Sequence, residues 1–236
     1  MVAILAATWD EIKRLNGIIP KTEEGKWEEL EYIRGNVHGK PVVIVQTGVG
    51  IRRARKGASF IIQKFKPELI ISAGHGGALH PDLRVGDLVI GNWVLSLKKN
   101  EKRELATCIP DSGSGVKKGG ILTENRFIHD PMEKRRLFDI TGALCVDMET
   151  WGVAEAAMQS GTPVLSVRSI SDESAEIIPD MGSIYNHSGN IDKWKTLKYF
   201  ASRPYLILPF IRFRYINSKK SVDSLNRFLM GLIKHV

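Results

Sequence analysis

The stretch Glu68-Leu-Ile-Ile-Ser-Ala-Gly-His-Gly-Gly77 decides the fold class. Its apolar run is typical of a parallel strand that is buried on both faces, and the glycines after it predict a turn. The segment 41–50 repeats this arrangement, with a strand-like run before Gly48 and Gly50. Buried strands that end in glycine turns indicate an α/β protein.

Strand-like and helix-like segments alternate along the chain. Strands are expected at residues 2–6, 30–37, 41–46, 68–73, 85–94, 143–148 and 164–170, and helices at 51–65, 131–140 and 149–160. This order predicts a single α/β domain with a central mixed, mostly parallel twisted sheet flanked by helices. A hairpin turn is expected at 38–40, and a mobile loop region at 96–120, which is polar and contains Gly113-Ser114-Gly115 and Gly119-Gly120.

Ligands of such sheets bind at the carboxyl ends of the strands. The expected ligand-binding loops are therefore residues 8–11, 47–50, 74–77, 147–149 and 171–172.

Charge is distributed unevenly over the 236 residues. Residues 1–192 carry 24 Lys and Arg against 25 Asp and Glu, whereas residues 193–236 carry 10 against one. Eight of the 18 aromatic residues also lie in this last segment. We expect a near-neutral domain over residues 1–189 and a basic, aromatic-rich helical extension over residues 190–236. A hydrophobic content of 43% and a charged content of 25% exclude a disordered chain, a collagen and a coiled coil.

The sequence favours a reducing, cytoplasmic location. Its two cysteines, Cys108 and Cys145, cannot form a disulfide framework or a zinc knuckle. No segment has the ~20 consecutive apolar residues that span a bilayer, and Asp10 and Glu11 interrupt the apolar start too early for a signal peptide. Nothing in the sequence implies a metal or an organic cofactor.

Several common catalytic motifs are absent from the sequence. Gly48-Val-Gly50 begins like a dinucleotide fingerprint, but Arg53 stands where the third glycine belongs. There is no phosphate loop, no Gly-x-Ser-x-Gly and no His-Glu-x-x-His. Four carboxylates at predicted strand ends remain: Glu11, Asp147, Glu149 and Asp172. For Asp147 a helix cap or a salt bridge is favoured, and the other three fall where a ligand is expected.

Two of these carboxylates belong to motifs that resemble a known family. Val146-Asp-Met-Glu-Thr150 resembles the ribose-binding signature of the nucleoside phosphorylase and nucleosidase superfamily, and Val167-Arg-Ser-Ile-Ser-Asp172 resembles its purine-site strand. Three further matches complete the pattern: Thr47–Gly50, Ser72–Leu79 and Val85–Val89. Within the superfamily, the chain is most similar to the methylthioadenosine/S-adenosylhomocysteine nucleosidases and to hopanoid-associated phosphorylase-like proteins.

The resemblance implies three catalytic residues. Asp172 would be the general acid, or a hydrogen-bond partner, at purine N7, and the Ser171 hydroxyl would orient its carboxyl group. Glu11 would activate the attacking water, and Arg168 would help to hold that water or a phosphate. Trp9 replaces one of the acidic residues that precede Glu11 in the nucleosidases.

The resemblance also implies the substrate contacts. Glu149 would accept hydrogen bonds from the ribose hydroxyls, Met148 would pack under the sugar or fill the core, and Phe127 and Ile128 would contact adenine. Further contacts are expected from Gly48, Gly74 and His75. His75 replaces a small hydroxyl residue of the nucleosidases, and it could donate to phosphate or only fill space.

Several questions stay open at this point. We expect N-glycosidic cleavage that releases adenine from a 5′-substituted adenosine, with water or phosphate as nucleophile. The apolar-basic extension favours a hydrophobic substituent such as that of adenosylhopane. The alternatives are a soluble methylthioadenosine/S-adenosylhomocysteine nucleosidase and a non-catalytic, membrane-docked purine-binding protein.

The partners are open in the same way. The extension suits a peripheral membrane contact, or it packs on the body or on a second copy; it lacks a nucleic-acid reading motif. The resemblance implies a homodimer. Arg52, Arg53 and Arg55 could contact phosphate, but a solvated helix face is favoured.

Overall fold

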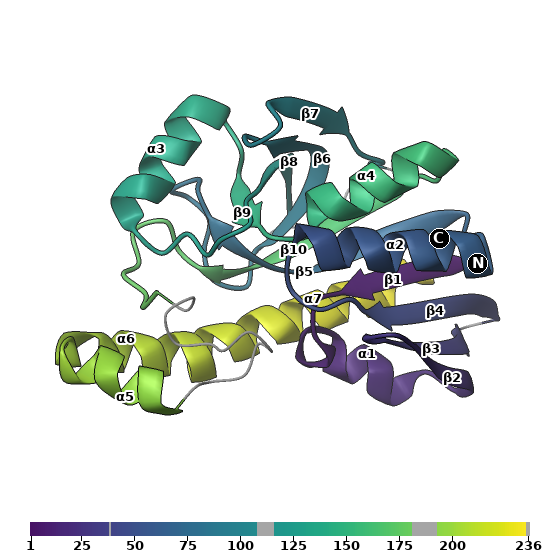
Figure 1. Ribbon diagram of the computed structural model, residues 1–236, viewed down its shortest axis with the longest axis horizontal. Helices are drawn as coiled ribbons and strands as arrows, with labels where there is room; N and C mark the ends of the chain where they lie inside the picture. Colours follow the sequence, from purple (N-terminus) through teal and green to yellow (C-terminus); the bar gives the residue numbers. More distant parts are fainter. Residues whose placement is uncertain (38, 108–115, 181–192, 235–236) are drawn as a thin grey trace.

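The computed structural model describes residues 1–37, 39–107, 116–180 and 193–234. A twisted sheet lies between two layers of helices (Figure 1). Helices α2 (Ile51–Phe65) and α4 (Thr150–Ser160) cover one face, and α1 (Lys13–Ile18) and α7 (Ser218–Leu232) cover the other. The α/β class that the sequence predicts is therefore confirmed.

The sheet has ten strands in the order β10-β6-β8-β9-β5-β1-β4-β3-β2, with β7 paired to β6. Their bounds are β1 Val2–Ala6, β2 Lys21–Trp27, β3 Leu30–Val37, β4 Lys40–Gln46, β5 Leu69–Ala78, β6 Leu88–Ser96, β7 Glu101–Glu104, β8 Val116–Thr123, β9 Cys145–Asp147 and β10 Val164–Asp172. Because β10 also pairs with β5, five strands close on themselves into a ring. Among the described residues, five strand pairings are parallel and five antiparallel, so the sheet is mixed but not mostly parallel.

The remaining helices are α3 (Pro131–Thr141), α5 (Lys193–Ala201) and α6 (Ile207–Ile211), with short turns η1 (Trp9–Ile12), η3 (Pro204–Leu206) and the π-helical η4 (Arg212–Asn217). Helix α3 begins where the Asp130 side chain accepts a hydrogen bond from the Met132 N–H (3.1 Å) and Pro131 occupies the first turn. Helix α4 ends at Gly161, as predicted, since this glycine adopts the left-handed conformation (φ 68°).

The predicted elements do not include α1 or β2, and two predicted segments differ from the structure. The predicted loop region 96–120 contains β7 and the start of β8. Gly119 and Gly120 do not break the strand: they leave room for neighbouring side chains, because a Cβ there would lie 2.4 Å from Leu144 and 2.0 Å from Trp93. The predicted turn at 74–77 is also wrong, since β5 continues through it to Ala78. Gly113-Ser114-Gly115 and Cys108 lie outside the described residues.

The C-terminal part divides into two regions with different surroundings. Helix α7 belongs to the body, because Leu225, Leu229 and Leu232 are buried in the same core cluster as β1 and β4. Residues 193–217, which we call the C-terminal arm, form α5, η3, α6 and η4 at one end of the molecule (Figure 1). The expected domain boundary at 189/190 lies outside the described residues. Over the described ranges, no helix is both long and apolar enough to cross a membrane.

Candidate active site

Strands β5 and β10 bring several predicted site residues together. They pair in parallel, with Arg168 opposite Gly74 and Asp172 opposite Gly77. A Cβ on Gly74 would lie 2.9 Å from Glu11 Oε1, and one on Gly77 would lie 3.1 Å from Asp172 Oδ2. Glycine at these positions therefore lets two carboxylates approach the β5 backbone closely.

Arg168 is fully buried and has all its donors matched by the protein. Its Nε lies 2.6 Å from Asp147 Oδ2. Its terminal nitrogens donate to the Ser72 carbonyl (2.9 Å) and hydroxyl (2.8 Å), the Val167 carbonyl (3.1 Å) and the Thr150 hydroxyl (2.9 Å). A guanidinium has five N–H donors, so none is left for water or phosphate. The structure thus does not support the expected direct contact of Arg168 with the nucleophile.

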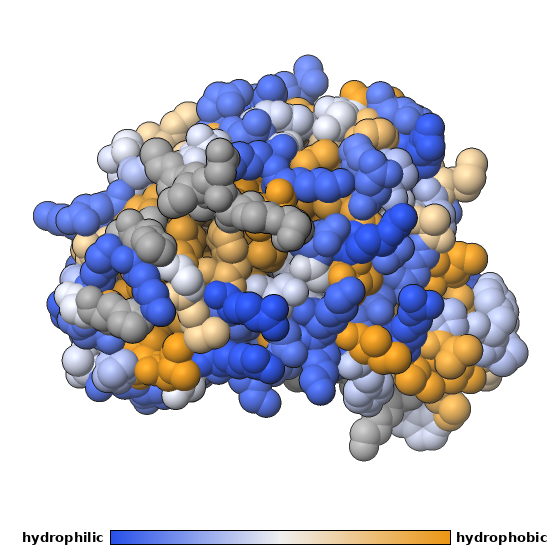
Figure 2. Space-filling view, turned by 180° about the vertical axis from the view of Figure 1, so that it is seen from behind, coloured by the Kyte–Doolittle hydropathy of each residue, from blue (hydrophilic) through white to orange (hydrophobic). Residues whose placement is uncertain are grey.

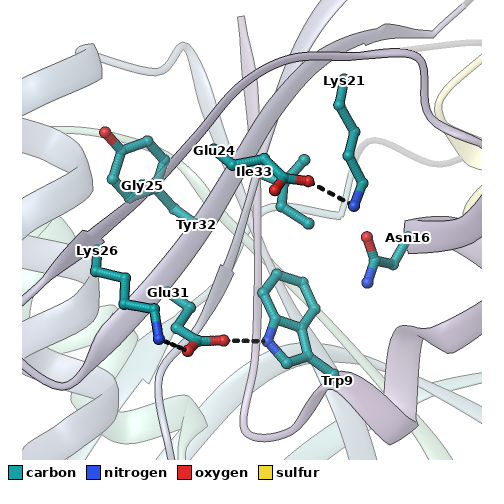
Figure 3. Close-up of a pocket in the computed structure, with 9 residues that line it drawn as sticks. All are labelled: Trp9, Asn16, Lys21, Glu24, Gly25, Lys26, Glu31, Tyr32 and Ile33. Carbon is teal, nitrogen blue, oxygen red and sulfur yellow. Dashed lines mark hydrogen bonds and ion pairs between the residues drawn. The ribbon is translucent and has the colours of Figure 1, made fainter.

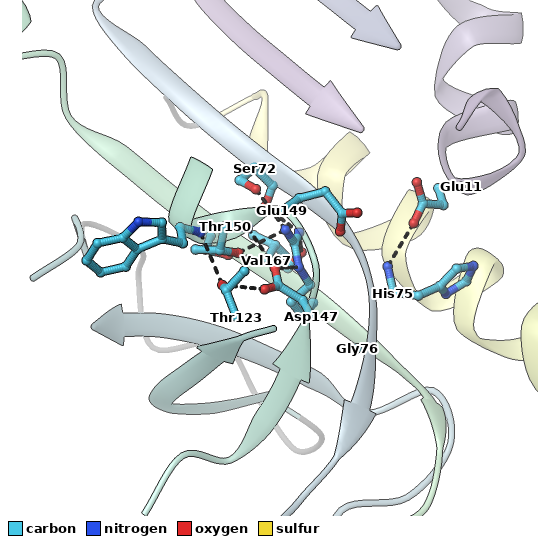
Figure 4. Close-up of polar contacts among 12 residues, drawn as sticks. Glu11, Ser72, His75, Gly76, Thr123, Asp147, Glu149, Thr150 and Val167 are labelled. Atoms are coloured by element: carbon cyan, nitrogen blue, oxygen red, sulfur yellow. Dashed lines mark hydrogen bonds and ion pairs between the residues drawn. The ribbon is translucent and has the colours of Figure 1, made fainter. Parts of the chain in front are cut away.

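Asp147 lies at the centre of this network (Figure 4). Its Oδ1 accepts from the Thr123 hydroxyl (2.6 Å), and its Oδ2 accepts from the backbone N–H of Thr150 (3.0 Å), the first residue of α4. Asp147 therefore caps α4 and forms a salt bridge with Arg168, the two structural roles that the sequence favours. Since Asp147 supplies the cap, the side chain of Glu149 can point elsewhere.

Glu149 extends from this cluster toward Glu11 and His75 (Figure 4). Its Oε1 accepts from the backbone N–H of Gly50 (2.9 Å). Burial and then the nearby Asp147 carboxylate raise the pKa of Glu149 to about 8, although Arg168 acts in the opposite direction. Glu149 therefore keeps its proton to higher pH than an ordinary glutamate.

Glu11 lies in η1, just after β1, and the resemblance assigns it as the water-activating acid. Its Oε1 accepts from the backbone N–H of His75 (3.1 Å), and its Oε2 accepts from that of Thr8 (2.9 Å). The Asn226 side chain of α7 donates to the Glu11 carbonyl (2.8 Å). The carboxylate is thus fixed by backbone groups of β5 and of the segment after β1, and α7 fixes the backbone of the same residue.

His75 has a defined tautomer. Its Nδ1 lies 2.7 Å from the hydroxyl of Ser221 on α7, which itself donates to the Ser169 carbonyl (3.0 Å). The hydroxyl hydrogen is used in this second bond, so Nδ1 is the donor and Nε2 carries a lone pair. Burial lowers the pKa of His75, which keeps the ring neutral. A neutral Nε2 acceptor cannot donate to phosphate.

Asp172 is 1% exposed, at the end of β10. Its Oδ1 accepts from the Ser171 hydroxyl (2.6 Å), as expected. Its Oδ2 accepts from the ammonium of Lys134, which is 0% exposed and also donates to the Glu173 carbonyl (3.0 Å). Lys134 has no counterpart among the predicted site residues.

The expected purine contacts lie on the segment after β8. Ile128 is buried, and Phe127 is half-buried with its ring 6.1 Å from that of Phe213 in an edge-to-face arrangement. Phe213 belongs to η4, so the C-terminal arm reaches this part of the site. Met148 is half-buried beside Glu149. Gly48 has a left-handed backbone (φ 78°) and faces Arg53.

The remaining charged groups fit structural roles. Arg53 pairs with Glu29 (3.6 Å) and Arg55 with Glu155 (3.3 Å) on the solvent side of α2, as favoured for this helix. Among the described residues, no cluster of three or more His, Cys, Asp or Glu could hold a metal ion.

A cavity of about 400 Å³ lies outside this site, between η1 and the β2–β3 hairpin (Figure 3). Its charged side chains are paired: Trp9 Nε1 donates to Glu31 (3.0 Å), Lys26 pairs with Glu31 (2.6 Å) and Lys21 with Glu24 (2.6 Å). The Asn16 side-chain oxygen is buried there without a hydrogen-bond partner in the described part of the chain. None of the predicted catalytic or substrate-binding residues lines it.

Comparison with known proteins identifies the family. The profile of the Phosphorylase superfamily matches residues 1–107 and 105–196. The chain belongs to this superfamily. As a member, it is an enzyme of the class of N-glycosidic phosphorylases and nucleosidases, which the sequence motifs predict.

Relatives of this superfamily member include a 5′-methylthioadenosine/S-adenosylhomocysteine nucleosidase of Staphylococcus haemolyticus, which is 28% identical over 73% of the chain and 86% of the relative. A nucleosidase of the same name from Actinobacillus succinogenes is 29% identical over 72% and 85%. The fold is also similar to that of a Neisseria meningitidis nucleosidase of this name, with a TM-score of 0.73 and 19% identity over 100% of this chain and 99% of the other. It is similar as well to Helicobacter pylori futalosine hydrolase, with a TM-score of 0.70 and 19% identity over 100% of this chain and 97% of the other.

Proposed function

We propose that this phosphorylase-superfamily enzyme hydrolyses the N-glycosidic bond of a 5′-substituted adenosine and releases adenine. The substrate class follows the methylthioadenosine/S-adenosylhomocysteine nucleosidases that are its relatives. One observation favours hydrolysis over phosphorolysis. The Glu11 carboxylate lies beside Arg168, and all five N–H groups of Arg168 are hydrogen-bonded to the protein. A general base suits water, whereas a phosphate dianion needs cationic donors.

The proposed reaction uses three carboxyl groups. Glu11 takes a proton from water as its oxygen bonds to C1′, and Glu149 holds the ribose hydroxyls. The C1′–N9 bond breaks with its electron pair on the purine, and Asp172 delivers a proton to N7. Buried groups arranged in this way act strongly on the charge that develops in the transition state.

Purified enzyme should release adenine from 5′-methylthioadenosine without added phosphate, and in ¹⁸O-labelled water the label should enter the ribose product. Glu11→Gln should lower kcat by about 10²-fold, whereas Asp10→Asn, at the exposed neighbouring position, should not. Turnover that requires phosphate would contradict hydrolysis. Adenine binding without cleavage of any adenosine derivative would favour the non-catalytic alternative.

A second candidate differs only in the 5′ substituent. Phe213 of the C-terminal arm packs against Phe127, and the arm exposes large apolar side chains, so a bulky hydrocarbon such as that of adenosylhopane would find apolar surface beside the site. A higher kcat/KM in detergent for adenosine with a long 5′-alkyl chain than for methylthioadenosine would support this candidate. The reverse preference would support the thioether.

The C-terminal arm also supports a peripheral contact with an anionic membrane. Trp194, Tyr205 and Leu208 are 81%, 71% and 74% exposed, and residues 193–217 contain six Lys and Arg but no Asp or Glu. Figure 2 shows apolar and polar side chains side by side at this end of the molecule. A surface of this kind suits the boundary between lipid headgroups and acyl chains.

A homodimer is part of the same proposal. Val49, between Gly48 and Gly50 at the edge of the site, is 45% exposed, so a second copy could cover it. Light scattering coupled to size-exclusion chromatography should give a mass of twice the 26.4 kDa of one chain. A monomeric mass at the concentration of the activity assay would contradict the homodimer.

A further inference from the structure

The ammonium of Lys134 is buried against the carboxylate of Asp172, on the side of the site where the purine is proposed to bind. Lys134 lies on α3, whose start is fixed by the Asp130 cap and Pro131. The next residue on this helix, Arg135, is exposed and pairs with Asp139 (3.1 Å). Only Lys134 of this pair of basic neighbours points into the protein, where its exposure is 0%.

Stability alone is a weak explanation for such a pair. Removing two charges from water costs several kcal/mol per ion, and apolar residues of similar volume often stabilise a protein as well or better. The other buried ion pair of the site, Arg168 with Asp147, is surrounded by hydroxyls and carbonyls that match its donors. Among the described residues, the Lys134 ammonium has one further partner, the Glu173 carbonyl (3.0 Å).

The two cations also differ in chemistry. An arginine guanidinium does not lose its proton in proteins, whereas a lysine ammonium can. Both oxygens of Asp172 accept hydrogen bonds, from Ser171 and from Lys134. This arrangement suits a carboxylate, which has no proton of its own to donate to a leaving purine.

We propose that Lys134 is the positioning residue that stores the proton for the leaving purine and passes it through Asp172; this proposal rests on the proposed hydrolysis. As the C1′–N9 bond breaks, its electron pair stays on the purine. A proton moves from Lys134 Nζ to Asp172 as Asp172 delivers a proton to N7. Lys134 is left neutral, and it is recharged through solvent by the proton that Glu11 took from water, so protons balance over one turnover.

Two substrates with different leaving groups test this role. In 5′-methylthioadenosine the leaving purine needs a proton, whereas 4-nitrophenyl 5-methylthioriboside releases a stable anion that needs none. Lys134→Met should lower kcat for the adenosine by about 10²-fold, the scale of general acid catalysis, with KM changed less than threefold. Turnover of the nitrophenyl riboside should stay within about threefold of wild type, which also shows that the variant is folded.

Two further variants separate proton storage from charge and from folding. Lys134→Arg should remain as slow as Lys134→Met on the adenosine, since arginine keeps its proton. Arg135→Met, on the exposed side of the same helix, should behave as wild type. If Lys134→Met does not fold, Lys134→Gln takes its place in the same comparison, because glutamine keeps a hydrogen-bond donor to Asp172.

Three outcomes would overturn the role of Lys134: an equal loss on both substrates, no loss on the adenosine, or full activity of Lys134→Arg. Wild-type enzyme that cleaves neither substrate would instead overturn the proposed hydrolysis, and with it this inference.

Discussion

The end of the sheet that carries the site and the C-terminal arm use charge in different ways. In the sheet, Arg168 and Asp172 are each 1% exposed and have protein partners at close range. In the arm, Arg203 and Arg212 are exposed beside large apolar side chains such as Leu208. Buried, matched charges stabilise reacting groups in a low dielectric, whereas exposed cations next to apolar surface favour association with an anionic layer. Chemistry and membrane contact should therefore be separable by mutation.

The largest effect is expected when the matched network in the sheet is broken. Arg168→Met should lower the free energy of unfolding by about 3–5 kcal/mol, because Asp147 is then buried without its cation. Urea denaturation would measure this loss. Arg52→Met, at an exposed position of α2, should stay within about 0.5 kcal/mol of wild type. Equal free energies of unfolding for the two variants would show that the Arg168–Asp147 network does not stabilise the site.

Asp172→Asn should separate chemistry from membrane contact. The variant lacks the acid at the purine, so kcat for adenine release should fall by about 10²-fold or more. The Asp172→Asn variant should bind anionic vesicles as wild type does. The control Asp82→Asn, at a side chain that is 75% exposed, should keep wild-type activity. An unchanged rate in Asp172→Asn would remove the assignment of the general acid.

The raised pKa of Glu149 predicts a pH-dependent stability that belongs to the sheet. The folded protein holds a proton on Glu149 at pH 6 and loses it as the pH approaches its pKa of about 8, whereas an unfolded glutamate has already lost it by pH 6. The folded state binds more protons, so its stability falls as pH rises. We expect Glu149 alone to lower the free energy of unfolding by about 2 kcal/mol as the pH rises from 6 to 8.

Denaturation of wild type and Glu149→Gln at pH 6 and pH 8 would isolate this contribution. The stability of the glutamine variant relative to wild type should increase with pH by the same amount, because glutamine does not titrate. A difference that does not change with pH would place the pKa of Glu149 near its ordinary value.

The smallest effect is expected in the arm. Arg203→Gln should weaken binding to phosphatidylserine-containing vesicles about fivefold, since each basic residue near an anionic surface contributes about 1 kcal/mol. Turnover of methylthioadenosine in solution should not change. Arg135→Gln, an exposed arginine of α3, is the matched control for vesicle binding. If the wild-type protein does not bind anionic vesicles, the proposed membrane contact is contradicted.

Much of the fold could be predicted because apolar runs and helix ends are local signals. Residues 2–6 and the helix 51–65 coincide with β1 and α2. The strand β8 and the continuation of β5 were missed for one shared reason. Glycines at 74, 76, 77, 119 and 120 resemble turn residues in sequence, but in the structure they make room for side chains that lie far away along the chain. Close packing of this kind has no local signal.

The site could be predicted only where a motif names a residue. Glu11, Glu149 and Asp172 come from motifs, and the structure places them around β5 and β10. Their roles stay predictions. Lys134 could not be found in this way, because a lysine between Glu133 and Arg135 is typical of a solvated helix face. Ser221, which fixes the tautomer of His75, is likewise an ordinary serine until the fold brings α7 to β5.

The hydrogen bonds between α7 and the site also bear on when the site forms during synthesis. Asn226 ties down both the Glu11 carbonyl and the Leu15 N–H, and Ser221 anchors His75. The segment that follows β1 is therefore expected to reach its final conformation only after α7 has been synthesised. We therefore expect a chain that lacks α7 to have no ordered catalytic site.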